Sequence, residues 1–217
     1  GAERLANDVR WKYGVPPNGN ANFAWIQHMI HHLSPKGKVG LVLANGSLSS
    51  QTGGEGEIRK NLLEADMVEG IVALPSQLFF SVQIPACLWF FNRQKKQQGK
   101  VLFVDARNMG SMVSRTQREL SEEDILKISD SFKAYQVGTL EDEKGFCATV
   151  TLEDIAKQDY ILTPGRYVGI AETEDDGEPF QEKMERLTSE LSEMFEQSHK
   201  LEDEIKKQLA TIGFTIK

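Results

Sequence analysis

Two hydrophobic patterns alternate along the first half of the chain. Apolar side chains recur at helical spacing in residues 21–33 and again in residues 56–65. Four other runs are short and almost continuously apolar, which is typical of strands buried on both faces of a sheet: residues 38–44, 68–74, 85–91 and 100–106. The order helix, strand, helix, strand, strand, strand predicts part of a layered α/β fold.

The connections predict how the later strands pair. Residues 77–84 and 92–99 follow strands in close succession, so we expect hairpins there and antiparallel strands at one edge of a mixed sheet. Asn20 is suited to cap the first helix. Residues 1–19 are polar and irregular, whereas a doubly wound domain normally opens with a strand and a glycine-rich turn. The front of the sheet is therefore expected to be missing.

The composition changes beyond residue 110, where charged residues become frequent. Ser121 is placed to cap a helix over residues 122–134, and residues 135–170 look irregular. A long helix is predicted over residues 180–209. We expect three parts: residues 1–110 with the sheet, residues 111–178 as a helical and irregular connection, and residues 179–217 as a helical C-terminal arm.

One face of the long helix repeats in steps of four and three. Seven of its nine positions are apolar: Phe180, Met184, Leu187, Leu191, Met194, Ser198, Leu201, Ile205 and Gln208. This is the spacing of a heptad seam. The seam either packs on the chain's own domain or docks on a partner helix, and the second reading is favoured because the other faces are nearly all Glu, Lys, Gln and Ser.

The composition is that of a soluble globular protein, with 40% apolar and 26% charged residues in a chain of 217. No apolar run approaches the roughly 20 residues that cross a membrane, and no secretory leader opens the sequence. Cys87 and Cys147 lie among apolar neighbours, which indicates reduced thiols and no disulfide. These features predict a cytoplasmic protein that does not enter a membrane.

Charge divides the chain into unlike halves. Residues 1–110 carry 12 Lys and Arg against 8 Asp and Glu, whereas residues 111–217 carry 13 against 24. Nucleic-acid binding depends on neutralising phosphates, so the acidic half excludes a protein that holds nucleic acid with its whole surface. Any DNA contact is expected in the first half, although acidic residues that merely maintain solubility explain the second half equally well.

Few residue constellations indicate chemistry by themselves. His28 and His32 have the spacing of two metal ligands on one helix face, but no third ligand is evident, so we expect no metal site. Residues 53–56 are rich in glycine yet lack the lysine and hydroxyl residue of a phosphate-binding loop. The residues alone therefore predict part of an α/β domain and a helical arm.

Seven stretches are more specific, and they occur in order: NANFAWIQH at 20–28, LANGSLSS at 43–50, GEGEIRK at 54–60, IVALPSQLFF at 71–80, IPACLWF at 84–90, VDAR at 104–107 and YILTPGRYVG at 160–169. Together they resemble the modification subunit of type I restriction-modification systems, an adenine-specific DNA methyltransferase that uses S-adenosylmethionine. The resemblance covers roughly residues 5 to 170. It implies the second half of a Rossmann-like methyltransferase sheet, followed by a helical arm.

The family's catalytic tetrapeptide, Asn-Pro-Pro-Phe, is absent from this sequence. Residues 15–18 read Val-Pro-Pro-Asn, with an apolar side chain where the amide is needed. The glycine-rich cofactor turn is absent as well. The resemblance thus implies a fragment that begins just after the tetrapeptide, carries no catalytic or cofactor-binding residue, and is inactive alone. S-adenosylmethionine is expected to bind the intact enzyme only.

The resemblance also implies roles for particular residues. Phe79, Phe80 and Asn45 lie beyond strand ends and are predicted to wall the pocket for the flipped adenine, although core phenylalanines and a plain turn residue are the simpler alternatives. Arg59 and Lys60 are predicted to contact DNA phosphates. The helical arm is predicted to dock on the specificity subunit through a subset of the seam: Met184, Leu187, Leu191, Met194, Leu201 and Ile205.

Two classes of protein remain open. The first is a methyltransferase fragment, whose partners are DNA, the specificity and restriction subunits, and the missing N-terminal half of its own domain. The second is a stand-alone interaction module that docks on a specificity subunit through its helix. A stand-alone module is expected to cover the edge of its first strand, whereas a fragment leaves that edge bare.

Overall fold

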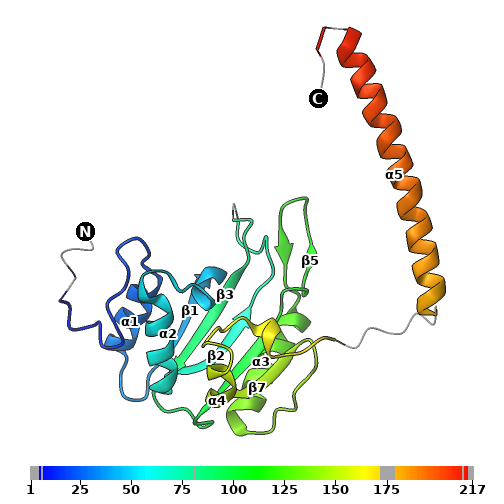
Figure 1. The fold of residues 1–217 in the computed structure, drawn as a ribbon. Helices are drawn as coiled ribbons and strands as arrows, with labels where there is room; N and C mark the ends of the chain where they lie inside the picture. Colours follow the sequence, from blue (N-terminus) through cyan, green and yellow to red (C-terminus); the bar gives the residue numbers. More distant parts are fainter. Residues whose placement is uncertain (1–4, 6, 81, 172–178, 212, 215–217) are drawn as a thin grey trace. The chain divides into compact units, whose positions relative to one another are not determined.

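A computed structural model describes residues 5, 7–80, 82–171, 179–211, 213 and 214 of the chain (Figure 1). It separates two compact units, residues 1–172 and residues 173–217. The first unit holds a five-stranded sheet with helices on both faces. The second unit holds one long helix, α5 (Phe180–Thr211).

The sheet has the strand order β1-β3-β2-β4-β7. Its strands are β1 (Lys38–Ala44), β2 (Val68–Ala73), β3 (Ala86–Asn92), β4 (Lys100–Asp105) and β7 (Cys147–Thr151). β1, β2 and β4 run in one direction, because β2 and β4 are parallel while β1 and β2 both pair antiparallel with β3. β7 pairs antiparallel with β4. The predicted mixed α/β sheet with an antiparallel edge is confirmed, and the structure has antiparallel pairs at both edges.

Only one of the two predicted hairpins forms. β2 and β3 pair as expected, but β3 lies between β1 and β2 and uses both of its hydrogen-bonding edges there. β4 therefore pairs with the far side of β2, in a parallel register that places Gly70 opposite Leu102. The hairpin predicted at residues 92–99 is wrong: this connection passes the amino end of β2, where the Asn92 amide donates to the Met67 carbonyl (3.0 Å).

β1 is an edge strand, although its continuous apolar sequence predicts burial on both faces. Its side chains alternate, with positions 39, 41 and 43 turned toward the core and Val42 49% exposed on the other face. Within the described residues, β3 is its one strand partner. The prediction of a doubly buried strand is wrong because nothing described covers the second face or the outer edge.

The helices form at the predicted places. α1 (Asn22–His32) and α2 (Glu55–Glu64) pack on one face of the sheet, and α3 (Glu122–Val137) packs on the other (Figure 1). The Asn20 side chain accepts a hydrogen bond from the Asn22 amide (3.0 Å) at the start of α1. Ser121 and Asp124 form a reciprocal capping box at the start of α3.

Trp89 anchors the carboxyl end of β1 to the sheet. Its side chain is fully buried, it meets Phe23 of α1 edge to face, and its indole nitrogen donates to the Ser47 hydroxyl (3.0 Å). A buried tryptophan needs such a partner for its N–H. The Ser47 hydroxyl in turn donates to the Ala44 carbonyl (2.8 Å). The turn after β1 is thereby held in a fixed position against β3.

Residues 135–170 are more regular than predicted. They include β7, the short helix α4 (Leu152–Ala156) and a 3-10 turn at Pro164–Arg166. Thr151 caps α4 by accepting a hydrogen bond from the Asp154 amide (3.2 Å), and Tyr167 stacks on Phe103 of β4 with 4.2 Å between ring centroids. Sequence periodicity missed these elements because none exceeds five residues.

The sheet does not end near residue 110, where the sequence predicts a boundary. β7 belongs to the same sheet, and the compact unit extends to residue 172. The predicted long helix is observed as α5, whose seam residues are all substantially exposed: Met184 42%, Leu187 43%, Leu191 49%, Met194 62%, Leu201 61% and Ile205 52%. Among the described residues, no helix is long and apolar enough to span a membrane.

Candidate functional site

The carboxyl ends of β1, β2 and β4 lie along one edge of the sheet, here called the carboxyl edge. Asn45, Leu74 and Ala106 are the first residues beyond these strands. Backbone hydrogen bonds hold two of them in place: Leu74 N donates to Ala86 O, and Ala106 N donates to Ala73 O, each at 2.9 Å. Open α/β sheets bind ligands beyond the carboxyl ends of their strands, so this edge is the candidate site.

The loop between β2 and β3, residues 74–85, is here called the Phe loop. Phe79 is 41% exposed and Phe80 is 91% exposed, so the alternative reading as core phenylalanines is wrong. Phe79 and Val82 form a short antiparallel bridge within the loop. Gln77 adopts a left-handed backbone conformation with φ of 65°, which costs about 1 kcal/mol or more for a residue with a side chain.

A groove of about 390 Å³ opens between β1, the start of α1 and the Phe loop. Its lining consists of Asn22, Val42, Leu43, Ala44, Phe79, Val82, Ile84, Pro85 and Ala86. Of the described residues that line it, Asn22 alone has a polar side chain. The structure therefore brings Phe79 into an apolar groove of the kind that holds a planar ring. Phe80 and Asn45 lie at the same edge but outside this lining.

Asn45 begins the turn that follows β1, and its amide oxygen is buried without a hydrogen-bond partner among the described residues. A buried acceptor left unpaired costs about 1–3 kcal/mol. Such an oxygen is suited to accept a hydrogen bond from an amino group. The predicted role of Asn45 in the base pocket remains a prediction, and this unpaired acceptor is consistent with it.

Arg59 does not lie on a DNA-facing surface. Its side chain is fully buried within α2, where the guanidinium donates to the Tyr160 carbonyl (2.6 Å) and to the Ser50 carbonyl (2.8 Å). Burial lowers the pKa of Arg59, and Glu55 one turn earlier opposes that change. The predicted phosphate contact by Arg59 is therefore wrong: the residue ties α2 to the turns at residues 50 and 160.

Lys60 remains partly exposed beside the buried Arg59. Its ammonium group lies 5.7 Å from the centroid of the Tyr160 ring, within the range of a cation–π contact. This contact places Lys60 over α2 and the Tyr160 turn rather than in the groove. Its predicted contact with a DNA phosphate stays a prediction.

A second projection stands beside the Phe loop, and the sequence analysis missed it. It is a hairpin of β5 (Ser111–Met112) and β6 (Arg118–Glu119), here called the Arg hairpin. The Gln117 side chain donates to the Leu78 carbonyl (2.9 Å), and the Arg118 amide donates to the Gln77 carbonyl (2.9 Å). Strands of two residues are too short to give a periodic signal in the sequence.

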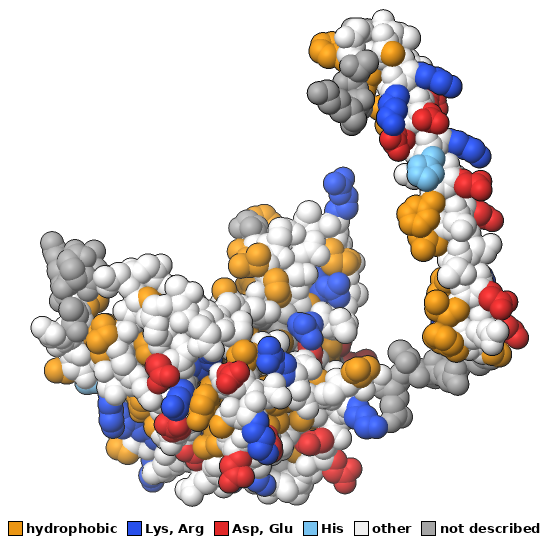
Figure 2. Space-filling model, viewed as in Figure 1, with side chains coloured by type: hydrophobic (Ala, Val, Ile, Leu, Met, Phe, Trp, Pro, Cys, Tyr) orange, Lys and Arg blue, Asp and Glu red, His pale blue; other side chains and the backbone are white. Residues whose placement is uncertain are grey.

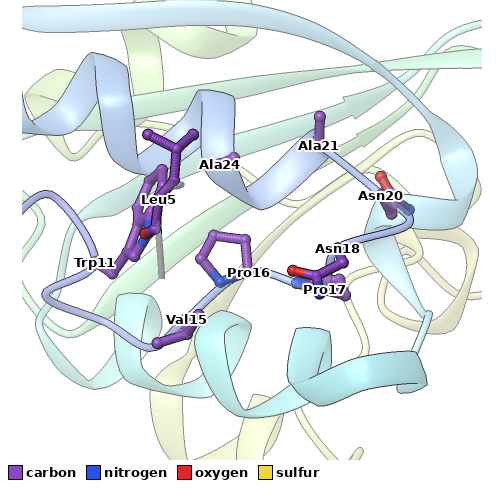
Figure 3. A pocket seen from close by; sticks show the side chains of 9 residues that line it. All are labelled: Leu5, Trp11, Val15, Pro16, Pro17, Asn18, Asn20, Ala21 and Ala24. Carbon is purple, nitrogen blue, oxygen red and sulfur yellow. The ribbon is translucent and has the colours of Figure 1, made fainter. Parts of the chain in front are cut away.

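The irregular N-terminal segment forms a small apolar pocket against α1 (Figure 3). The pocket is about 230 Å³, and its lining is Leu5, Trp11, Val15, Pro16, Pro17, Asn18, Asn20, Ala21 and Ala24. Residues 15–18 pass along it as a loop between α1 and α2, and Pro16 is buried. They do not follow a strand of the described sheet, so Val-Pro-Pro-Asn lacks the placement as well as the side chains of a catalytic tetrapeptide.

The histidines of α1 are engaged with one another and with Arg10. The Nδ1 atom of His28 lies 2.7 Å from a guanidinium nitrogen of Arg10, and its ring centroid lies 4.5 Å from that of His32. Burial, followed by the charges of His32 and Arg10, lowers the pKa of His28. Across the described ranges, no three His, Cys, Asp or Glu residues are placed to hold a metal ion. Cys87 and Cys147 are free, buried thiols.

Comparison with known proteins places this geometry in a family. The family profile described as N-6 DNA Methylase matches residues 1–176. The chain is 58% identical to the Type I restriction enzyme HindI methylase subunit of Haemophilus influenzae, covering 98% of this chain and 48% of that relative. It is 48% identical to the Type I restriction enzyme MjaIX methylase subunit of Methanocaldococcus jannaschii, covering 94% of this chain and 37% of that relative.

A solved structure of a type I methyltransferase subunit has a similar fold. The type I restriction-modification system methyltransferase subunit from Streptococcus thermophilus superposes with a TM-score of 0.70 at 28% identity, covering 78% of this chain and 35% of that chain. This chain thus spans half or less of the length of the relatives it matches. The profile match over most of the sequence, together with these relatives, shows that the chain belongs to the N-6 DNA methylase family.

Proposed function

We propose that this chain supplies the second half of the catalytic domain of a type I modification subunit, which transfers a methyl group from S-adenosylmethionine to adenine in DNA. The observation that carries the proposal is the 58% identity to a type I methylase subunit over 98% of the chain. In this proposal the carboxyl edge, with its apolar groove, forms one wall of the site that receives the flipped base.

The edge of β1 supports a fragment over a stand-alone module. Val42 belongs to an almost continuously apolar strand, yet its side chain is 49% exposed. The outer edge of β1 has no strand partner in the described part of the chain. A further strand on that edge would satisfy the open backbone groups. The missing N-terminal half of the domain is the proposed occupant.

The chain's own residues fit the base side of the reaction better than the cofactor side. Among the described residues that line the groove there is no carboxylate, whereas nucleotide-like cofactors in such sheets are commonly held by an acidic residue at the ribose and a glycine-rich turn. We therefore assign no step of methyl transfer to S-adenosylmethionine bound by this chain. Phe79 and Phe80 offer an apolar wall to the base, and Asn45 offers an acceptor for its amino group.

The exposed seam of α5 is the proposed docking surface for the specificity subunit. Its seven apolar positions repeat at heptad spacing on a helix whose other faces are mostly charged or polar, which is the pattern of a helix that packs on another helix. Leu191→Glu and Leu201→Glu are expected to abolish complex formation without unfolding the sheet. Ser192→Glu, which adds the same charge off the seam, is expected to leave the complex intact in a pull-down assay.

A chimera tests the proposed activity. Residues 1–217 replace the matching stretch of the Haemophilus influenzae methylase subunit, and transfer of a radiolabelled methyl group to duplex DNA is measured with the specificity subunit of that enzyme. We expect methylation within roughly tenfold of the parent rate. A folded chimera that assembles but transfers no methyl group contradicts the proposal.

The same chimera tests the base wall. Phe79→Ala and Phe80→Ala are expected to slow methylation while leaving the affinity for S-adenosylmethionine unchanged. Phe195→Ala is the matched control, because Phe195 is 57% exposed on α5 and lies off the seam. Unchanged turnover in both loop variants contradicts the assignment of the Phe loop to the base.

A further inference from the structure

The Arg hairpin and the Phe loop project together from the carboxyl edge (Figure 1). Two hydrogen bonds from Gln117 and Arg118 to the carbonyls of Leu78 and Gln77 join the second strand of the hairpin to the Phe loop. Arg118 also holds the base of the hairpin, where its guanidinium donates to the Met109 carbonyl (3.1 Å) and the Gly110 carbonyl (3.0 Å). The hairpin is therefore fixed relative to the loop that lines the groove.

The base of the hairpin requires a glycine. Gly110 has φ of 77°, and a Cβ atom there would lie 2.5 Å from the Glu119 carbonyl oxygen. The tip is ordered as well, because the Ser114 hydroxyl accepts hydrogen bonds from the amides of Thr116 (3.3 Å) and Gln117 (3.1 Å). A two-stranded ribbon with both ends organised in this way presents its tip residue, Arg115, in a defined position.

The Arg115 side chain is exposed at the tip of the hairpin. Within the described part of the chain, its guanidinium has no hydrogen bond or ion pair. By contrast, Arg107, which precedes the hairpin, forms an ion pair with Asp105. The hairpin, residues 111–119, contains two arginines and one acidic residue, Glu119, although residues 111–217 as a whole carry 24 acidic against 13 basic residues. The hairpin thus has a small net positive charge within the acidic half of the chain.

Apolar side chains flank this charge. Met112 is 44% exposed and Val113 is 54% exposed on the hairpin, and Phe80 is 91% exposed on the Phe loop. Figure 2 shows basic and apolar side chains together on this projection. A two-stranded ribbon fits the major groove of duplex DNA, and an arginine at its tip matches a backbone phosphate.

We infer that the Arg hairpin contacts duplex DNA beside the base-binding groove, with Arg115 at a backbone phosphate and with Met112 and Val113 against the groove wall. The inference rests on the proposed function, because the duplex must lie along the edge from which the adenine is taken. It replaces the buried Arg59 with an exposed arginine as the phosphate contact. It also places a DNA contact in the acidic half, where net charge predicts none.

Fluorescence anisotropy with a labelled duplex tests this inference on the full 217-residue chain. Arg115→Ala is expected to weaken binding roughly fivefold and to reduce the slope of log K against log salt by about 1. Arg115→Lys keeps the charge and is expected to retain the slope. Lys133→Ala, which removes an exposed cation of α3, is the matched control and is expected to change neither quantity. Circular dichroism confirms that all variants fold alike.

The inference is overturned if the wild-type chain fails to bind duplex DNA, if Arg115→Ala binds like wild type, or if Lys133→Ala has the same effect as Arg115→Ala. Loss of binding to a specificity subunit in Arg115→Ala, with DNA binding unchanged, also overturns it in favour of a protein contact. The result is separable from the methylation chimera. Methyl transfer without an Arg115 effect contradicts the hairpin alone, whereas an Arg115 effect without methyl transfer contradicts the proposed activity alone.

Discussion

The two edge strands of the sheet, β7 and β1, differ in how their outer edges are covered. At β7, the chain turns back on itself: Glu143 pairs with Cys147, and the Asp142 carboxylate accepts a hydrogen bond from the Thr149 amide (2.8 Å). At β1, no described strand or turn covers the outer edge, and Val42 stands half exposed. A sheet normally protects its edges against pairing with other chains. Within the described sheet β7 is therefore a protected edge and β1 an open one, and the open edge supports the proposal that a further strand pairs there.

The largest expected loss of stability is for a substitution of Tyr167, whose ring packs on β4 beside the β7 edge strand. Tyr167 stacks on Phe103 of β4 with 4.2 Å between ring centroids, and its hydroxyl donates to the Ile161 carbonyl. Tyr167→Ala is expected to lower the free energy of unfolding by about 2–4 kcal/mol in urea denaturation. Val42→Ala, on the open edge, is expected to change it by less than about 0.5 kcal/mol. Equal losses in the two variants contradict the contrast.

Arg59 gives the next effect in size. Arg59→Met preserves much of the buried volume but leaves the carbonyls of Ser50 and Tyr160 without their donor. A loss of about 1–3 kcal/mol in unfolding free energy is expected, with no change in the salt dependence of DNA binding. A changed salt slope with unchanged stability would instead restore Arg59 as a phosphate contact.

The dependence of folding stability on alkaline pH tests the burial of Tyr167 while keeping its ring in place. Burial raises the pKa of Tyr167 to about 12, against about 10 in an unfolded chain. Because the folded-state pKa is the higher one, the stabilisation is fully present below pH 10 and is lost as pH rises from about 10 to 12. Tyr167→Phe removes this titration, so its stability is expected to decline less between pH 9 and 11. Parallel declines in the two proteins contradict the assignment.

The smallest energetic effect is expected at β1 itself. Val42→Lys introduces a charge on the exposed face of the open edge strand, and its stability is expected to stay within about 0.5 kcal/mol of wild type. Self-association in sedimentation velocity is expected to fall, because a charge near an open edge discourages pairing between copies. Val42→Thr is the uncharged control. Identical self-association of Val42→Lys and wild type would contradict the view that β1 is an open edge strand that pairs with other chains.

The strands and helices of the first half were predictable because each is marked by a local pattern. Strand order was not, because the apolar run at residues 100–106 carries no mark of its partner, and β4 pairs across β2 rather than with β3. β1 is instructive: its sequence predicts burial on both faces, but the structure exposes Val42. The pattern of that strand fits a sheet wider than the one described.

The candidate site was predictable in part. Phe79 and Asn45 were placed beyond strand ends, and the structure locates both at the carboxyl edge. The burial of Arg59 could not be predicted from the sequence, because the Tyr160 carbonyl that its guanidinium contacts lies 101 residues away along the chain. The Arg hairpin was missed because its strands have two residues each and its link to the Phe loop depends on side-chain and turn hydrogen bonds.

The most direct test of the central claim is calorimetric titration of S-adenosylmethionine into two folded samples, the 217-residue chain alone and the chimera that adds the N-terminal part of the Haemophilus influenzae subunit. We expect the cofactor site to lie outside this chain and the base wall to lie within it, so the chimera is expected to bind S-adenosylmethionine saturably and the chain alone is not. Saturable binding by the chain alone would contradict the proposed function, because the cofactor site would then lie within residues 1–217.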